Sequence, residues 1–291
     1  MLNICCIGHI TLDKVITPHN TVHMAGGTSY YFSKALQLMD VNYGLVTSLG
    51  NSEMPVVEKL RSQGTPITAF TSAHSVYFEN SYSANQDQRT QRVLQKADAF
   101  SIDQLQDVEA EIFHLGPLLA DDMSLDVIKY LAGKGRLSLD AQGYLREVRN
   151  LAVHAVDWPQ KQEALQYISI LKVNEHELEA LTGETDIKAG ALILANWGVK
   201  EVVITLGSMG SVIYTDGVFY NVPAYIPDSV TDATGCGDTY MAGYLFKRVK
   251  GADIQEAGEF AAAMASIKIA NSGAFTGTEA DVMNFLAVKQ D

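Results

Sequence analysis

The segment Asp232-Ala-Thr-Gly-Cys-Gly-Asp238 places two acids and two glycines directly before a stretch of helical character, residues 239–248. Gly235 and Gly237 allow close approach of the backbone to a ligand, and the first amides of a helix are unpaired donors at the positive end of its dipole. This pattern predicts a phosphate site. Asp238 would repel a resting phosphate, so we interpret it as the base for a substrate hydroxyl. The structural alternative is an N-cap aspartate.

The same segment resembles the Asp-Thr-x-Gly-Ala-Gly-Asp signature of the ribokinase-like (pfkB-type) carbohydrate kinases, with Ala233 and Cys236 as small-residue variants. Further matches follow the order of that family's motifs: Asp13, Gly26-Gly27, Asn174-x-x-Glu177 and Thr205-Leu-Gly207-x-x-Gly210. The resemblance covers nearly the whole chain. It implies an ATP-dependent phosphotransferase acting on a hydroxyl of a sugar or an inositol-like polyol. It also implies an α/β fold with a mostly parallel central sheet flanked by helices and a small β-strand lid.

The resemblance assigns roles residue by residue. The residues implied for catalysis are Asp238 as base with Gly235, Cys236 and Gly237 at the transferring phosphoryl group. Those implied for substrate binding are Asp13, Gly26, Gly27, Asp140 and Gln142. Those implied for nucleotide binding are Asn174, Thr205, Gly207, Gly210, Asn271 and Gly273. Glu177 is implied for Mg²⁺, and Asp232 with the carbonyl of Thr234 for a monovalent cation such as K⁺.

Several of these positions have a structural alternative. A carboxylate such as Asp13 suits two neighbouring hydroxyls, but an aspartate after a strand is also typical of a turn. Mg²⁺ bound to ATP needs few protein ligands, which suits Asn174 and Glu177, yet the same spacing is that of a capping box. Gly273 is a candidate helix C-cap.

The substrate is less defined than the reaction. Thr28-Ser-Tyr-Tyr31 follows the glycine pair where typical ribokinases have Lys-Gly-x-Asn, which argues against ribose. The residues Asp140-Ala-Gln142 resemble a variant found in sugar and inositol-like members of the family. Nucleoside kinases share the fold and motifs and are the close alternative. A nucleotide-binding regulator without catalysis is a more distant one.

The surrounding elements alternate in the way that builds a parallel sheet. Apolar strands are predicted at 2–8, 43–49, 111–116, 136–140, 167–173 and 201–205, with helices at 56–63, 124–131, 239–248 and 254–270. A hairpin is predicted at 211–223 through Asp216-Gly217. The segments 15–24, as one strand, and 75–94, as a hairpin, are expected to form the lid. No linker interrupts the chain, so one domain is expected over 1–291.

Composition excludes other classes of function. The net charge of −13 and the absence of a clustered basic face argue against nucleic acid as a partner. The first strand lacks Gly-x-Gly-x-x-Gly, which weakens a dinucleotide oxidoreductase, and no P-loop is present. Three cysteines without disulfide spacing and no apolar stretch of membrane-spanning length predict a cytoplasmic protein. The expected partners are the small-molecule substrate and ATP, with a homodimer formed through the lid.

Overall fold

The computed structural model describes residues 1–18, 20–82, 89–227 and 229–289. Its larger sheet has nine strands, which neighbour one another in the order β15 (Val218–Val222), β14 (Ser211–Thr215), β13 (Glu201–Thr205), β12 (Ile170–Asn174), β9 (Arg136–Asp140), β8 (Ala110–Leu115), β1 (Leu2–Ile7), β4 (Tyr43–Leu49) and β5 (Ile67–Thr71). The pairs from β13 to β5 are parallel, and β14 and β15 form an antiparallel edge. The mostly parallel sheet is therefore as predicted, although β12 begins three residues later than expected.

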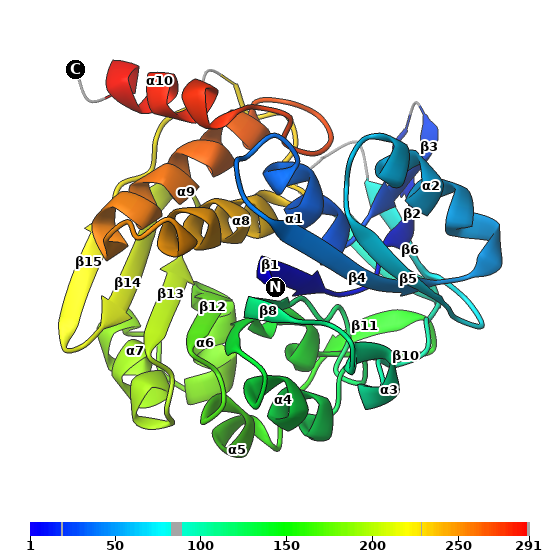
Figure 1. Ribbon diagram of the computed structural model, residues 1–291, viewed down its shortest axis with the longest axis horizontal. Helices are drawn as coiled ribbons and strands as arrows, with labels where there is room; N and C mark the ends of the chain where they lie inside the picture. The colour runs from blue at the N-terminus through cyan, green and yellow to red at the C-terminus, as the bar shows by residue number, and fades with distance from the viewer. Residues whose placement is uncertain (19, 83–88, 228, 290–291) are drawn as a thin grey trace.

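Helices cover both faces of this sheet (Figure 1). One layer contains α1 (Thr28–Leu36), α8 (Cys236–Val249), α9 (Ile254–Ile269) and α10 (Glu279–Lys289), and α2 (Met54–Ser62) adds Leu60 to it. The other contains α3 (Ile102–Leu105), α4 (Leu125–Ala132), α5 (Lys161–Leu165), α6 (Glu175–Thr182) and α7 (Ile187–Asn196). Strand β1 shows why the strands are apolar throughout: Ile4 and Cys6 face the first layer, and Cys5 and Ile7 face the second.

The second sheet, which we call the lid sheet, has six strands. They neighbour one another in the order β10 (Arg146–Arg149), β11 (Ala152–Ala155), β7 (Arg89–Gln95), β6 (Val76–Tyr82), β2 (Thr11–Ile16) and β3 (Thr21–Gly26). The predicted hairpin 75–94 is formed by β6 and β7, and its turn at 83–88 lies outside the described residues.

The prediction of one strand over 15–24 was wrong. Strands β2 and β3 form an antiparallel hairpin, and its turn is closed by a hydrogen bond from the Thr17 amide to the Asn20 carbonyl at 2.8 Å. Pro18 lies inside this turn, where its fixed φ and missing donor are tolerated. The sequence analysis also missed β10 and β11, which complete the lid sheet.

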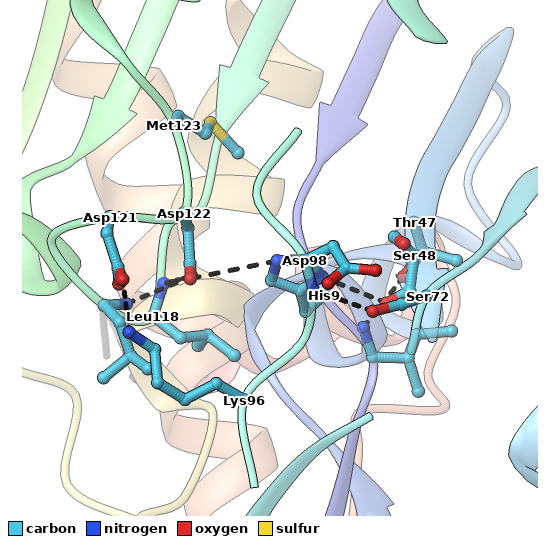
Figure 2. A network of polar contacts seen from close by, with 12 residues as sticks. His9, Thr47, Ser48, Ser72, Lys96, Asp98, Leu118, Asp121, Asp122 and Met123 are labelled. Atoms are coloured by element: carbon cyan, nitrogen blue, oxygen red, sulfur yellow. Dashed lines mark hydrogen bonds and ion pairs between the residues drawn. The ribbon is translucent and has the colours of Figure 1, made fainter. Parts of the chain in front are cut away.

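A buried polar network joins the lid sheet to the main sheet (Figure 2). His9, between β1 and β2, is fully buried. Its Nδ1 donates a hydrogen bond to the Ser48 carbonyl at 3.0 Å, and its Nε2 lies 3.8 Å from the Asp122 carboxylate. Asp122 in turn accepts the amides of Leu118 and Leu119. Because these residues lie at the carboxyl end of β4 and just after β1 and β8, the network fixes where the lid sheet leaves the main sheet. Among the described residues, no helix is long and apolar enough to cross a membrane.

Candidate active site

The anion-hole loop, which we define as residues 232–237, leads into the N-terminus of α8. Gly235 is the N-cap with φ of 76°, and a Cβ there would lie 2.3 Å from the Tyr31 ring, so both conformation and space require glycine. No side chain caps the helix, and the Cys236 amide already donates to the Ala233 carbonyl at 3.2 Å. The next amides, at Gly237 and Asp238, lie at the positive end of the helix dipole, where an anion is favoured.

Asp238 is the third residue of α8, so the N-cap alternative was wrong. Burial and the neighbouring Asp140 raise the pKa of this carboxyl to about 6, against the opposing effects of Lys172, a hydrogen bond from Thr28, and Arg146. Thr28 is the first residue of α1, and its methyl group packs against Gly116 at the end of β8. Asp238 is thus held at the carboxyl ends of the parallel strands as a carboxylate able to receive a proton near neutral pH.

Lys172 is a buried cation beside this carboxylate. Its Nζ donates to Asp140 Oδ2 at 3.0 Å and lies 3.8 Å from Glu177 Oε2. Burial alone would lower the pKa of Lys172, but Asp140 and Glu177 outweigh it and raise the pKa, so the ammonium stays charged. A Cβ on Gly237 would lie 3.2 Å from Lys172 Nζ, so this ammonium adjoins the start of α8.

Asp140 and Gln142 were predicted to bind substrate. Asp140 accepts the Gln142 amide on Oδ1 at 3.0 Å and Lys172 on Oδ2, so both of its oxygens are engaged within the protein. Burial would raise the pKa of Asp140, but Lys172 and the Gln142 amide lower it below its ordinary value. The geometry therefore makes Asp140 the anchor of Lys172, and Gln142 lies half-buried in the 3₁₀ turn Ala141–Leu145 that follows.

Asp13 lies within β2, so the turn alternative was wrong. It is 7% exposed, accepts a hydrogen bond from Thr11 Oγ1 at 2.7 Å, and its Oδ2 occupies the space that a Cβ on Gly26 would fill. Gly27 has φ of 88°, and a Cβ there would lie 2.4 Å from the His9 carbonyl oxygen. The glycine pair thus lets β3 pass directly over the Asp13 carboxylate.

Tyr31 lies within electrostatic reach of three of the predicted acids. Burial raises the pKa of its phenol, and the charges of Asp13, Asp232 and Asp238 raise it further. The ring is 2% exposed and packs on Gly235. The ring therefore joins α1 to the anion-hole loop, and the charge of Asp13 in the lid sheet acts on it as well.

The residues predicted to bind nucleotide follow β12, β13 and α9. Asn174 and Glu177 form the reciprocal capping box of α6, each accepting the other's amide at 2.8 Å, so this structural alternative is realised. Thr205 pairs with Asn174 across β12 and β13, and Gly207 and Gly210 bound the loop after it. At the end of α9, the Asn271 side chain donates to the Ile267 carbonyl and the Gly273 amide donates to Asp232 Oδ2.

Asp232 is tied to several backbone groups. Its Oδ1 accepts the Thr234 amide at 2.9 Å, and Lys268 Nζ donates to its main-chain carbonyl at 2.6 Å. In the part of the chain that the structure describes, no group of three or more His, Cys, Asp or Glu side chains is arranged to hold a metal ion. Glu177 Oε2 is engaged at the Asn174 amide, so this residue suits Mg²⁺ only as a sparse ligand of an ion carried by the donor's phosphates.

The chain also matches a known protein family over most of its length. The model of the pfkB family carbohydrate kinases matches residues 1–281. The chain belongs to this family.

Relatives of this pfkB kinase include proteins named for different substrates. It is 29% identical over 272 residues to a cytidine kinase of Thermococcus kodakarensis, covering 88% of this chain and 92% of that protein. It is 28% identical to a pyrophosphate-dependent kinase of the ribokinase family solved with a pyrophosphate analogue and myo-inositol, with a TM-score of 0.86 and coverage of 97% and 99%. The ribokinase of Arabidopsis thaliana, solved with ribose and ATP, is 22% identical with a TM-score of 0.82 and shares the fold.

The sequence analysis of this pfkB kinase missed Lys172, Tyr31 as a packing partner of the loop, and Lys268. A signal for Lys172 was present, because a lysine inside the otherwise apolar run 170–173 is costly to bury unless it is paired. Its partner Asp140 lies on another strand, and no spacing along the chain connects the two. Lys268 looks like an ordinary lysine in the last turn of a helix, and only its depth distinguishes it.

Proposed function

We propose that this protein transfers a phosphoryl group from ATP to a hydroxyl of a sugar or a polyol. The observation that carries the proposal is the packing of Gly235, at the start of α8, on Tyr31, whose phenol feels the charges of Asp13 and Asp238, with the charged Lys172 next to Gly237. One carboxylate there suits recognition of hydroxyls, and the other suits proton removal. The helix amides and the ammonium suit the phosphate that is transferred.

Asp238 takes the proton of the acceptor hydroxyl while the oxygen of that hydroxyl bonds to the γ-phosphorus of ATP. The bond between the γ-phosphorus and the oxygen that bridges it to the β-phosphate breaks, and ADP leaves. The amides of Gly237 and Asp238, together with Lys172, compensate charge on the phosphoryl oxygens. Mg²⁺, held by the donor's phosphates with Glu177 and Asn174 nearby, would supply charge neutralisation. Thr205, Gly207, Gly210, Asn271 and Gly273 are proposed to contact the nucleotide, and Asp140 to fix Lys172.

Support for a polyol acceptor comes from the pyrophosphate-dependent kinase solved with myo-inositol, whose fold and length this chain shares at 28% identity. A second candidate is a nucleoside kinase, which is favoured by the cytidine kinase of T. kodakarensis at 29% identity over most of both chains. The donor has a rival too, because the first of these relatives uses pyrophosphate. We keep ATP as the proposed donor because of two segments that could contact a nucleotide. These are the glycine loop 207–210 after β13 and the exposed residues 271–272 after α9, which lie next to the anion-hole loop.

The test is a matrix of acceptors against donors with the full chain. The acceptors are ribose, fructose, myo-inositol, cytidine, inosine and adenosine, and the donors are ATP and pyrophosphate, each with Mg²⁺. Products are identified by ³¹P NMR and mass spectrometry rather than by loss of donor alone. A phosphorylated polyol or sugar made with ATP supports the proposal, and a phosphorylated nucleoside selects the second candidate. ATP binding by calorimetry with no product from any acceptor would support the non-catalytic regulator.

Two further proposals concern the setting of the reaction. Cys5, Cys6 and Cys236 are all free thiols, which supports a reducing, cytoplasmic location. A homodimer through the lid sheet is proposed because such a contact would cover the outer face of β2 and β6, away from Asp13. Light scattering tests this homodimer by measuring the mass in solution of the full chain and of a variant with the charge of Lys14 reversed. Lys14 pairs with Glu79 on that face.

A further inference from the structure

Lys268 is a buried lysine that the proposed chemistry does not use. It lies in the last turn of α9 and is 1% exposed. Its Nζ donates to the main-chain carbonyl of Asp232 at 2.6 Å and lies 3.3 Å from Asp232 Oδ2. An ammonium is costly to bury, so a lysine at this depth is held by what it contacts. Both of these contacts are to Asp232, the residue that opens the anion-hole loop.

Asp232 passes this restraint on to its surroundings. Its carboxylate accepts the amides of Thr234 at 2.9 Å and Gly273 at 3.3 Å, and its own amide donates to the Ile269 carbonyl. Burial would raise the pKa of Asp232, but the hydrogen bonds of Thr234, the Lys268 charge and the Gly273 amide lower it, so the carboxylate stays ionised. The loop that feeds the start of α8 is thus bound to a fixed positive charge on the neighbouring helix.

We propose that Lys268 is a positioning residue whose ammonium takes the place of a monovalent cation behind the anion hole, so that the enzyme works without K⁺. The inference rests on the proposed phosphoryl transfer and revises the expectation that Asp232 holds such a cation. The Asp232 carbonyl and carboxylate oxygens already face an ammonium, and a second cation beside it would be repelled. Because the ammonium is covalently attached, the loop is ordered without the loss of freedom that capturing an ion would cost.

The first experiment uses the wild-type protein. Its turnover is measured with the best donor and acceptor in chloride salts of K⁺, Na⁺ and tetramethylammonium at equal ionic strength, with Mg²⁺ constant. Equal turnover in the three salts is expected. Turnover roughly tenfold higher in K⁺ than in tetramethylammonium would overturn the proposal. A rate change of this size is expected when the anion-hole groups are modestly misplaced.

The second experiment compares variants of Lys268 with a matched lysine. Lys268→Ala is expected to lower kcat by roughly 10–100-fold through misplaced anion-hole amides while the acceptor KM changes little. Added K⁺ or NH₄⁺ should restore part of that loss, because the shortened side chain leaves room beside Asp232. Lys268→Met fills the same room with an apolar chain and should not respond. The control is Lys247→Met, since Lys247 pairs with Glu256 at 2.9 Å on the far end of α8.

A third measurement does not depend on turnover. Hydrogen exchange at the amides of Thr234 and Gly273 is expected to be faster in Lys268→Met than in Lys247→Met, because Asp232 loses its anchor. Equal exchange in the two variants, or a Lys268→Ala enzyme with wild-type kcat, contradicts the role of Lys268. If the wild type phosphorylates no acceptor, the proposed function fails while the exchange result still decides the role of Lys268. If the variants do not fold, the salt comparison decides it.

Discussion

Asp238 and Lys172 share one buried charge cluster, but their surroundings act on them differently. Burial disfavours the charged form of each. Lys172 has two carboxylates beside it and keeps its charge. Asp238 has the like charge of Asp140 beside it, and its pKa rises to about 6. The cluster therefore contains a permanent cation and a carboxyl that exchanges its proton near neutral pH, which are the two roles that phosphoryl transfer to an alcohol requires.

The first prediction concerns the pH dependence that Asp238 imposes. A base acts when deprotonated, so raising its pKa moves the acid limb of the profile upward. The value of kcat/KM should be level above about pH 7, fall to half near pH 6, and fall about tenfold per unit below about pH 5. Asp238→Asn should abolish this limb and lower kcat by roughly 10²–10⁴. An Asn variant with unchanged kcat, or a profile that stays flat down to pH 4.5, would refute the assignment.

The second prediction concerns Lys172. Lys172→Met keeps the length of the side chain but removes the ammonium next to the start of α8, so kcat should fall by roughly 10²–10³. The acceptor KM should change less, because Asp13 and the lid sheet are untouched. Steady-state kinetics with both substrates varied measures this split. Lys14→Met, on the outer face of the lid sheet, is the control. Equal losses in Lys172→Met and Lys14→Met would assign Lys172 a purely structural role.

At the scale of elements, the hairpin of β2 and β3 presents Asp13 to the site. Thr11 and Gly26 are register partners in this hairpin, and the missing side chain at Gly26 leaves room for the Asp13 carboxylate. The two strands diverge from the main sheet at His9, whose ring stacks on Phe100. The position of one carboxylate therefore depends on strand register and on the junction beneath it.

Gly26→Ala tests this arrangement without a conformational penalty, since Gly26 is not among the glycines with positive φ. The new Cβ would lie 2.4 Å from Asp13 Oδ2, so the carboxylate must move. The acceptor KM should rise by roughly tenfold or more with the donor KM unchanged. Gly133→Ala is the control, because its φ is −74° and the nearest atom to its Cβ would be 3.3 Å away. An unchanged acceptor KM in Gly26→Ala would remove Asp13 from the substrate site.

Cys236 at the start of α8 illustrates how burial competes with a helix dipole. Burial raises the pKa of this thiol to about 11, Lys268 acts against the shift, and Asp232 and Asp238 add to it. Inactivation by iodoacetamide should therefore be slow at neutral pH and accelerate about tenfold per pH unit up to pH 10. Donor with Mg²⁺ should protect, and Cys236→Ala should be active and resistant. Rapid inactivation at pH 7, or equal inactivation of Cys236→Ala, would show that another thiol or an unperturbed one reacts.

At the scale of the whole molecule, the site lies above a core that contains buried polar groups. His114 in β8 is fully buried, stacks on Phe32, and has Nδ1 3.0 Å from Ser138 Oγ. Burial lowers the pKa of this imidazole to about 4, Lys172 lowers it further, and Asp140 opposes them. The histidine is thus neutral wherever the enzyme is expected to work.

This imidazole predicts part of the acid sensitivity of the fold. Between pH 6.5 and about 4 the unfolded chain binds a proton at His114 that the folded chain does not, so acidification destabilises the protein. The contribution approaches roughly 3 kcal/mol at the acid end of that window. His114→Gln retains a hydrogen-bonding side chain and does not titrate, so its free energy of unfolding should fall less between pH 6.5 and 4.5. Protonation of Asp238 affects the free energy of unfolding in the opposite sense. This effect is the same in the wild type and in His114→Gln, so it cancels in the comparison. Parallel curves from denaturant titrations would contradict the prediction.

Much of the molecule was readable from local sequence. The strands of the main sheet are runs apolar on both faces, and the helices between them have periodic apolar faces, so their order alone predicts the parallel sheet. The anion-hole loop was readable for the same kind of reason. Two glycines and two acids lie within seven consecutive residues, directly before a stretch of helical character. The error at 15–24 arose because a six-residue strand, a turn and a second short strand carry less signal than a long buried one.

The tertiary structure alone decided which charges meet. Asp140 and Lys172 are 32 positions apart and Asp232 and Lys268 are 36 apart, and neither spacing follows from a helix or a strand. Both pairs form because neighbouring parallel strands or packed helices bring them together. Burial then raises the pKa of Asp238, Asp140 and Glu177 keep Lys172 charged, and Lys268 restrains Asp232. The sequence predicts a base, an anion site and a hydroxyl-binding acid, because each of these predictions rests on adjacent residues. How strongly they are tuned depends on desolvation and on partners from distant segments, which only the folded chain supplies.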